Sequence, residues 1–246
     1  MLKLVESDEL AIHSFLVSVK SQANHTISIL DEIALETGTI IVMPDERVLY
    51  DVPDSIFKAS GNDLAHQFLE GVRFMHENQV AHLDLKPDNL LVTITRSPLR
   101  LLIIDFGVSR RVSTKESWVK GYRGTEGWAA PEVQHDEYQP IRADLWSAGK
   151  VLQYIAGCQH ANTNSASALP FKYKSLAEKL QQRDPLKRPL LGSSIDLYQE
   201  NPPISSLKKR KRSVDIQEEN ERMGRQRRVG LEGGQSGKCH LESSSS

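Results

Sequence analysis

The segment His82-Leu-Asp-Leu-Lys-Pro-Asp-Asn89 places a carboxylate, an ammonium group and an amide in one short polar loop. Further along the chain, Asp105-Phe-Gly107 supplies a second carboxylate. Phosphoryl transfer asks little covalent chemistry of a protein, because it needs an oriented nucleophile, bound metal ions and neutralised phosphate charge. Oxygen ligands of this kind suit Mg²⁺ rather than a metal that prefers His or Cys. The two segments therefore predict a hard-cation site beside this polar loop.

The spacing of apolar residues around these segments predicts their secondary structure. Ser60 and Asp63 resemble a capping box, so a long helix is expected to begin at Ser60. Two apolar runs flank Thr95-Arg-Ser-Pro98 and indicate a hairpin, which brings Asn89 and Asp105 together. The expected strands are residues 2–5, 39–43, 90–94 and 101–104, and the expected helices are residues 9–19, residues from 60 onward and residues 141–156.

Composition limits the class of protein. The 246 residues are 39% hydrophobic and 26% charged, which is typical of a globular protein with one sizeable core. A formal net charge of -1 gives no reason to expect direct nucleic-acid binding or a membrane partner. Cys158 and Cys239 lie too far apart to suggest a disulfide framework, and no run is apolar enough to span a membrane. We therefore expect an intracellular monomer.

The C-terminal part of the chain has a different composition. Residues 199–246 contain a Pro-Pro pair, charge runs and four terminal serines, with too few apolar residues to offset the entropy of ordering. This tail is expected to be disordered. The simplest interpretation of its basic run, Lys208–Arg212, is a set of solvated charges. The functional alternative is a nuclear-import signal, which would add a nuclear location to the cytoplasmic one.

Five motifs in order resemble the eukaryotic protein kinase family, of the serine/threonine type. They are HLDLKPDN (82–89), DFG (105–107), GTEGWAAPE (124–132), DLWSAG (144–149) and RDPLKRP (183–189). A single tripeptide of this kind arises by chance, whereas all five in order do not. The resemblance implies ATP and Mg²⁺ as cofactors, a protein with Ser or Thr hydroxyls as the substrate, and transfer of the γ-phosphoryl group.

The resemblance assigns roles to the residues of the loop and of the segments that follow it. Asp84 would accept the proton of the substrate hydroxyl, and Lys86 would contact the transferring phosphate. Asn89 and Asp105 would hold magnesium. Thr125 would line the substrate groove, and together with Lys86 it resembles the serine/threonine subclass.

Four residues near the N-terminus resemble the nucleotide-binding half of the family's site. Lys3 resembles the strand lysine and Glu9 its helix glutamate, although the separation between them is short for the family. Met43 would close the back of the adenine pocket, and Asp45 would follow it in the connection between the lobes.

Other residues match positions that have a structural rather than a chemical role in the family. Glu132 and Arg188 resemble a buried ion pair, and Asp144 resembles the aspartate that holds the catalytic loop's backbone. His82 is expected to pack under the metal-binding segment. Leu83 stands where many members have an arginine that pairs with a phosphate on the activation segment, so weak dependence on such phosphorylation is expected.

The fold class expected from the resemblance is α+β: a small β-rich lobe, a mainly helical large lobe and a disordered tail. The expected divisions are residues 1–46, 47–198 and 199–246. No glycine-rich loop precedes the catalytic loop, so the small lobe is expected to lack its first strands. The alternatives are therefore a pseudokinase-like binding or scaffold protein, or a fragment that cannot bind ATP productively. A small-molecule phosphotransferase is disfavoured, because the family's Ala130-Pro-Glu132 segment serves protein substrates.

Overall fold

The computed structural model describes residues 1–95, 97–160 and 172–192. The chain divides into two compact units, Met1–Tyr198 and Gln199–Ser246, and the described residues all belong to the first. The tail for which the sequence predicts disorder lies outside the described residues. Within the described part, no helix is long and apolar enough to cross a membrane.

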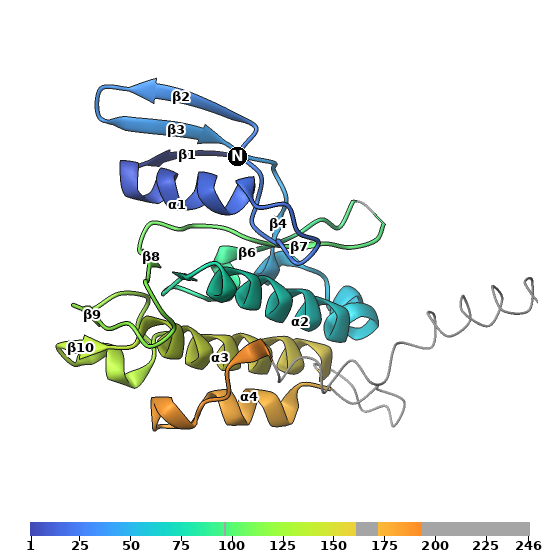
Figure 1. Ribbon diagram of the computed structural model, residues 1–246. Coiled ribbons are helices and arrows are strands. Elements are labelled where there is room, and N and C mark those ends of the chain that lie inside the picture. The colour runs from blue at the N-terminus through green and yellow to red at the C-terminus, as the bar shows by residue number, and fades with distance from the viewer. Residues whose placement is uncertain (96, 161–171, 193–246) are drawn as a thin grey trace, which may run out of the picture. The chain divides into compact units, whose positions relative to one another are not determined.

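A three-stranded antiparallel sheet and one helix form the upper part of the unit (Figure 1). Helix α1 (Ser7–Ser18) begins with Asp8 and Glu9, whose negative charges favour the positive end of the helix dipole. The strand expected at residues 2–5 and the helix expected near residues 9–19 are confirmed. The strands are β1 (Leu2–Val5), β2 (Asp31–Leu35) and β3 (Gly38–Val42), in the order β1-β3-β2.

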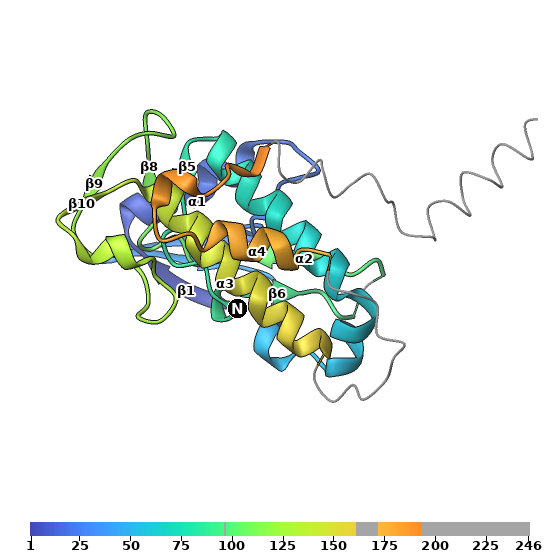
Figure 2. The ribbon, with the colours of Figure 1, turned by 90° about the horizontal axis from the view of Figure 1, so that it is seen from below.

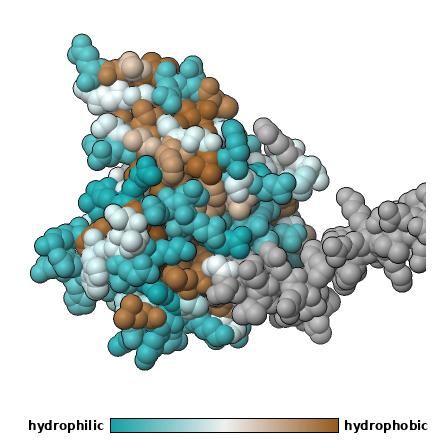
Figure 3. All heavy atoms as spheres, in the orientation of Figure 1, coloured by the Kyte–Doolittle hydropathy of each residue, from teal (hydrophilic) through white to brown (hydrophobic). Residues whose placement is uncertain are grey.

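Side chains alternate across this sheet, as the period of a strand requires. Lys3, Val5 and Ile41 share the inner face, where Val5 and Ile41 are buried. The outer face is mostly apolar and largely exposed, with Leu2 67% and Leu4 56% accessible. Figure 3 shows brown apolar spheres gathered over this upper sheet. The side chains of this outer face are Leu2, Leu4, Asp31, Ile33, Leu35, Ile40 and Val42.

Three helices make up most of the lower part, and Figure 2 shows them from below. Helix α2 (Asp54–Glu77) packs on α3 (Pro140–His160), and α3 packs on α4 (Lys174–Leu180). Their facing sides are fully buried and form the main core, which includes Phe68 and Leu152. The expected mixed α and β architecture is confirmed.

Helix α2 begins at Asp54, so the prediction that it begins at Ser60 is wrong. Pro53 occupies the N-cap position and fixes an extended backbone immediately before the helix. Phe57 is 1% exposed and extends the buried face about two turns towards the N-terminus from Leu64. Burial of this first part of the helix decides where the helix starts, and the polar pair at Ser60 and Asp63 lies inside the helix.

Short strands connect the two parts. The expected hairpin is confirmed, since β6 and β7 pair antiparallel with Leu90 opposite Ile103. Two further pairs, β5 with β8 and β9 with β10, hold the chain on either side of Asp105 and Thr125. The remaining elements are β4 (Arg47–Val48), β5 (Val80–Ala81), β6 (Leu90–Val92), β7 (Leu101–Ile103), β8 (Arg110–Arg111), β9 (Val119–Lys120), β10 (Glu137–Tyr138) and the 3₁₀ turns Leu49–Asp51, Pro87–Asn89, Pro131–Gln134 and Pro185–Lys187.

Candidate active site

The loop between β5 and β6 is held from below by a buried carboxylate on α3. Asp144 is 0% exposed, and its two oxygens accept hydrogen bonds from the backbone N–H groups of His82 and Leu83, both at 2.7 Å. Leu83 has a φ of 65°, a conformation that costs a residue with a side chain about 1 kcal/mol or more. The expected role of Asp144 as the anchor of this loop is confirmed by these contacts.

Three polar side chains meet above that anchor. The hydroxyl of Thr125 donates to Asp84 Oδ1 at 2.7 Å, and Lys86 Nζ donates to Thr125 Oγ1 at 2.6 Å. Lys86 Nζ also lies 2.9 Å from Asp84 Oδ2. The three side chains are only partly exposed, so one closed triangle of donors and acceptors orients the Asp84 carboxylate.

Asn89 joins this triangle to the segment that carries Asp105. Its side-chain Nδ2 donates to the carbonyl and to Oδ2 of Asp84 at 2.8 and 3.0 Å. Its backbone carbonyl accepts from Ile104 N at 3.0 Å, one residue before Asp105. The amide oxygen of Asn89 therefore stays available as a ligand, beside the carboxylate of Asp105. An amide oxygen and a carboxylate are ligands that Mg²⁺ takes.

The described residues contain no group of three or more His, Cys, Asp or Glu side chains at metal-binding separation. A site made of one carboxylate and one amide fits Mg²⁺, which keeps several waters and takes further ligands from substrate phosphates. It does not fit a metal that requires a cage of protein ligands.

Lys3 lies between two acids from different elements. Its Nζ forms an ion pair with Glu9 on α1 and lies 2.8 Å from Asp105 Oδ1. Burial of Lys3 opposes its charge, but the hydrogen bonds to Asp105 and Glu9 prevail and raise its pKa. Burial likewise opposes the charge of Asp105, yet the hydrogen bond from Lys3 lowers the pKa of that carboxyl. Both groups are therefore charged at neutral pH.

Three rings next to Asp105 in sequence or space pack against one another in tilted contacts. Phe106 is 1% exposed, and its ring centroid lies 5.0 Å from that of His13 and 5.3 Å from that of His82. His82 Nε2 also donates to the carbonyl of Ile104 at 3.0 Å. The expected packing of His82 under the metal-binding segment is confirmed. Asp105 has a φ of 69°, which turns its carboxylate away from the buried Phe106 and towards Lys3.

Residues 46–168 match the protein kinase domain family, which is half of the chain. The chain belongs to the protein kinase family. The match covers the catalytic loop, Asp105 and Thr125, whereas Lys3 and Glu9 precede it.

Known members of the kinase family resemble this chain over about half of its length. Human myosin light chain kinase family member 4 is 33% identical over 147 residues, which are 56% of this chain and 37% of that protein. Rabbit serine/threonine-protein kinase 17A is 34% identical over 155 residues, 58% of this chain and 38% of that protein. The titin homolog of Caenorhabditis elegans is 43% identical over 113 residues, 45% of this chain and 1% of that protein. The match thus spans less than two fifths of each of these relatives.

The kinase fold brings the predicted site residues together in two groups. One is Lys3, Glu9 and Asp105, and the other is Asp84, Lys86, Asn89 and Thr125. Met43 is 3% exposed and packs in the core beneath the upper sheet. Asp45 is exposed between β3 and β4, and among the described contacts it has no hydrogen bond or ion pair with either group.

The structural matches hold the large lobe of the kinase domain together. Arg188 is 1% exposed and donates to Glu132 Oε2 at 2.8 Å, so the expected buried pair is confirmed. Arg188 also donates to the carbonyls of Gln182 and Arg142, so that, with the two bonds to Glu132, four of its five N–H groups have an acceptor.

His13 is the residue that sequence reasoning missed. It is 1% exposed, it lies on α1 four residues after Glu9, and its Nε2 donates to the carbonyl of Ile27 at 2.8 Å. Burial lowers the pKa of His13, and the hydrogen bond to Ile27 only partly offsets that effect. Its spacing of four from Glu9 is the signal that could have identified it, because such residues share one helix face.

Proposed function

We propose that this chain is a protein serine/threonine kinase that uses ATP and Mg²⁺. The observation that carries the proposal is the contact of Lys3 Nζ with both Glu9 and Asp105, next to the Asp84 triangle. A cation held between a helix carboxylate and the metal-binding carboxylate is the arrangement that phosphoryl transfer from ATP requires. A fold used only as a scaffold has no need to keep it.

In this mechanism the oxygen of a substrate Ser or Thr hydroxyl bonds to the γ-phosphorus, while the bond from that phosphorus to the β-phosphate oxygen breaks. Asp84 takes the hydroxyl proton. Lys86 neutralises charge on the transferred group, and Lys3 binds the phosphates of ATP. Mg²⁺, held by Asn89 and Asp105, would offset the charge of the phosphates.

Thr125 supports a hydroxyl substrate in particular. Its own hydroxyl donates to Asp84 Oδ1, which is the contact that the hydroxyl of a substrate Ser or Thr would make before it gives up its proton. The serine/threonine class also agrees with the name of the rabbit relative. A protein substrate with Ser or Thr hydroxyls and an intracellular, cytoplasmic or nuclear location stay predictions from sequence.

The test is transfer of label from [γ-³²P]ATP to casein in the presence of Mg²⁺. Asp84→Asn and Asp105→Asn should each lower the rate by roughly a thousandfold, because each removes a group that acts in the transition state. Asp88→Asn is the matched control, since Asp88 is an exposed acid in the same loop. Equal rates for all four proteins, each shown to be folded by its thermal transition, would contradict the proposal.

A further inference from the structure

The outer face of the upper sheet is an apolar surface that stays open to solvent. Four of its side chains are between 47% and 67% exposed, namely Leu2, Leu4, Ile33 and Leu35. The opposite face of the same sheet is packed, since Val5 and Ile41 belong to a buried cluster. Single exposed apolar residues are ordinary, whereas a contiguous group of them with a polar rim marks an interaction site. The outer face therefore has the properties of an interaction surface.

The apolar side chains of this face form rows across the three strands. Leu4 on β1, Ile40 on β3 and Ile33 on β2 lie opposite one another in one row. Leu2 and Val42 form a neighbouring row. Side chains directly opposite each other on paired strands are in contact, because their Cβ atoms are only about 5 Å apart. The rows therefore make one continuous apolar surface.

Negative charge surrounds this apolar surface. Residues 1–46 contain eight acids and only two lysines, and one of these, Lys3, is already paired with Glu9 on the inner side of the sheet. Asp31 lies on the outer face itself, and Glu36 lies in the turn between β2 and β3 at the other end of the face. Both carboxylates are exposed, and neither has a cationic partner in the described part of the chain. The rim of the surface is therefore acidic.

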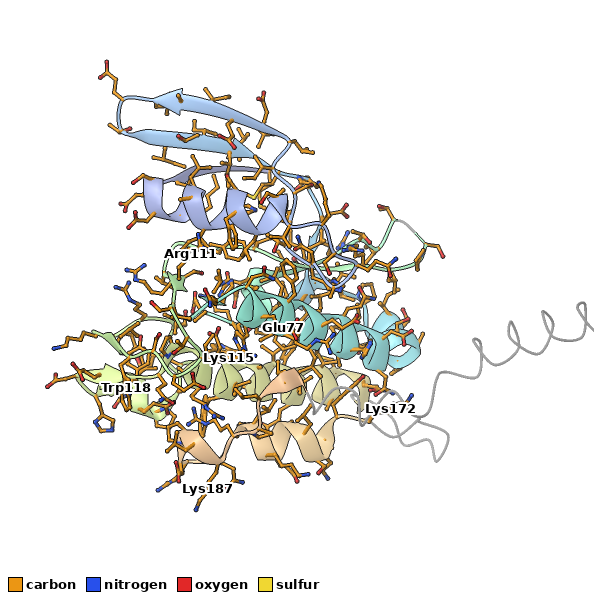
Figure 4. All side chains as sticks on the ribbon, viewed as in Figure 1. Glu77, Arg111, Lys115, Trp118, Lys172 and Lys187 are labelled. Atoms are coloured by element: carbon orange, nitrogen blue, oxygen red, sulfur yellow. The ribbon has the colours of Figure 1, made fainter. Side chains whose placement is uncertain are left out.

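This acidity is a local property of the upper part of the molecule. The whole chain has a formal net charge of only -1, so the residues after 46 carry a net positive charge. Four basic side chains that Figure 4 labels all lie below the upper sheet, namely Arg111, Lys115, Lys172 and Lys187. A partner that binds the outer face would therefore meet negative charge, although the chain as a whole is nearly neutral.

The combination of an apolar surface and unpaired acids favours one class of occupant. Two copies of the chain that met by this face around a two-fold axis would bring Asp31 and Glu36 of both copies into one interface, where like charges repel. An anionic lipid surface would be repelled in the same way. A strand from another protein would pair with an edge of the sheet and leave the face open. A helix with an apolar stripe and basic flanks matches both features.

We propose that the outer face of the β1-β3-β2 sheet binds a basic amphipathic helix of a partner protein. Strands β2 and β3 have five residues each, so the face is about 17 Å long, and its three strands make it about 10 Å wide. A helix of about 11 residues has that length and about that width. Its apolar stripe would cover Leu4, Ile40 and Ile33, and its Lys or Arg side chains would lie beside Asp31 and Glu36. Lys3 is on the opposite face of the sheet, so this binding does not depend on the proposed kinase activity.

The test is fluorescence anisotropy of a labelled synthetic helix of leucine and lysine, with the leucines on one side, titrated with the full chain. A peptide with glutamate in place of each lysine is the charge control. A peptide with the same composition in scrambled order is the control for the apolar stripe. The first peptide should bind about tenfold more tightly than either control, because only it matches both the apolar surface and the charge of the face. Added salt should weaken that binding, since exposed charges are screened.

Substitutions on the face and away from it separate this site from general stickiness. Ile33→Thr should weaken binding of the basic peptide about tenfold, because it removes apolar surface from the middle of the interface. The double variant Asp31→Asn with Glu36→Gln should weaken binding severalfold and reduce its salt dependence. Leu186→Thr is the matched control, because Leu186 is 67% exposed, as Leu2 is, but lies in the 3₁₀ turn after α4. It should bind the peptide as the wild type does.

Leu2→Thr keeps the test decisive if the thermal transition shows that Ile33→Thr does not fold, because the Leu2 side chain is largely exposed. Equal binding of the basic and acidic peptides, or binding that survives both Ile33→Thr and Leu2→Thr, would overturn the proposal.

Light scattering of the chain alone and co-sedimentation with phosphatidylserine vesicles test the other two occupants. We expect a monomer at micromolar concentration and no sedimentation with the vesicles. A dimer or a vesicle-bound protein that Ile33→Thr abolishes would assign the face to that occupant and overturn the proposal. Failure of the kinase assay would leave all of these measurements unaffected.

Discussion

Replacement of Asp144 by asparagine should destabilise the protein through the catalytic loop. The carboxylate accepts the N–H groups of both His82 and Leu83, whereas an amide has a single oxygen to offer. One backbone donor would then face an NH₂ group in a fully buried position. Loss of a hydrogen bond to a charged acceptor costs about 1.5–3 kcal/mol, and the orphaned donor adds about 1 kcal/mol or more. We expect the free energy of unfolding to fall by about 3 kcal/mol.

Urea denaturation followed by tryptophan fluorescence measures this loss, with an unchanged m-value as the sign of an unchanged unfolding reaction. Asp136→Asn is the control, because Asp136 is an exposed aspartate in the turn before β10. A free energy of unfolding for Asp144→Asn within about 0.5 kcal/mol of that control would refute the reasoning, since surface substitutions already vary by that amount.

Three further perturbations test the packing around the site. Glu132→Ala should cost about 3–5 kcal/mol in urea denaturation, because it leaves the buried guanidinium of Arg188 unpaired; a cost below 1 kcal/mol would contradict this. The stability difference between wild type and Lys3→Met should be constant at neutral pH. The difference should vanish at low pH, as the pH falls below the ordinary value of 3.8 and through the lowered pKa of Asp105. It should also vanish at high pH, as the pH rises above the ordinary value of 10.5 and through the raised pKa of Lys3. The pKa of His13 is lowered in the folded state, so as pH falls the imidazole is protonated in the unfolded state before it is in the folded state. The free energy of unfolding should therefore fall as pH drops below 6.5. His13→Leu should flatten that part of the pH profile, and an unchanged slope would exclude His13 as its cause.

The large lobe was the most predictable part of the fold. Its motifs lie close together in the sequence, and one hairpin suffices to place Asn89 beside Asp105. The ion pair of Lys3 and Glu9 followed from resemblance, although the short separation argued against it. Strand β2 gave no signal, because all five of its residues are exposed and an edge strand of that kind lacks a buried face.

Contacts between distant segments could not be predicted from local pattern. Arg110 on β8 lies opposite Ala81 on β5, immediately before the catalytic loop, and only the pairing of these two distant strands brings them together. The weak dependence on phosphorylation that Leu83 suggests stays a prediction. The start of α2 was missed for a related reason, since burial of Phe57 is a property of the packed core rather than of a capping sequence.

The apolar outer face of β1, β3 and β2 has a practical consequence for handling the protein. Leu2, Leu4, Ile33 and Leu35 are each about half exposed or more, on a sheet whose β1 edge has no described partner strand. Purified material should therefore lose solubility at millimolar concentration and adsorb to plastic at nanomolar concentration, which would imitate low specific activity. Leu2→Thr and Leu4→Thr would place β-branched residues that favour a strand at these positions. They would also reduce the apolar surface that is exposed to water. A preparation with those two changes is the better starting point for a quantitative kinase assay.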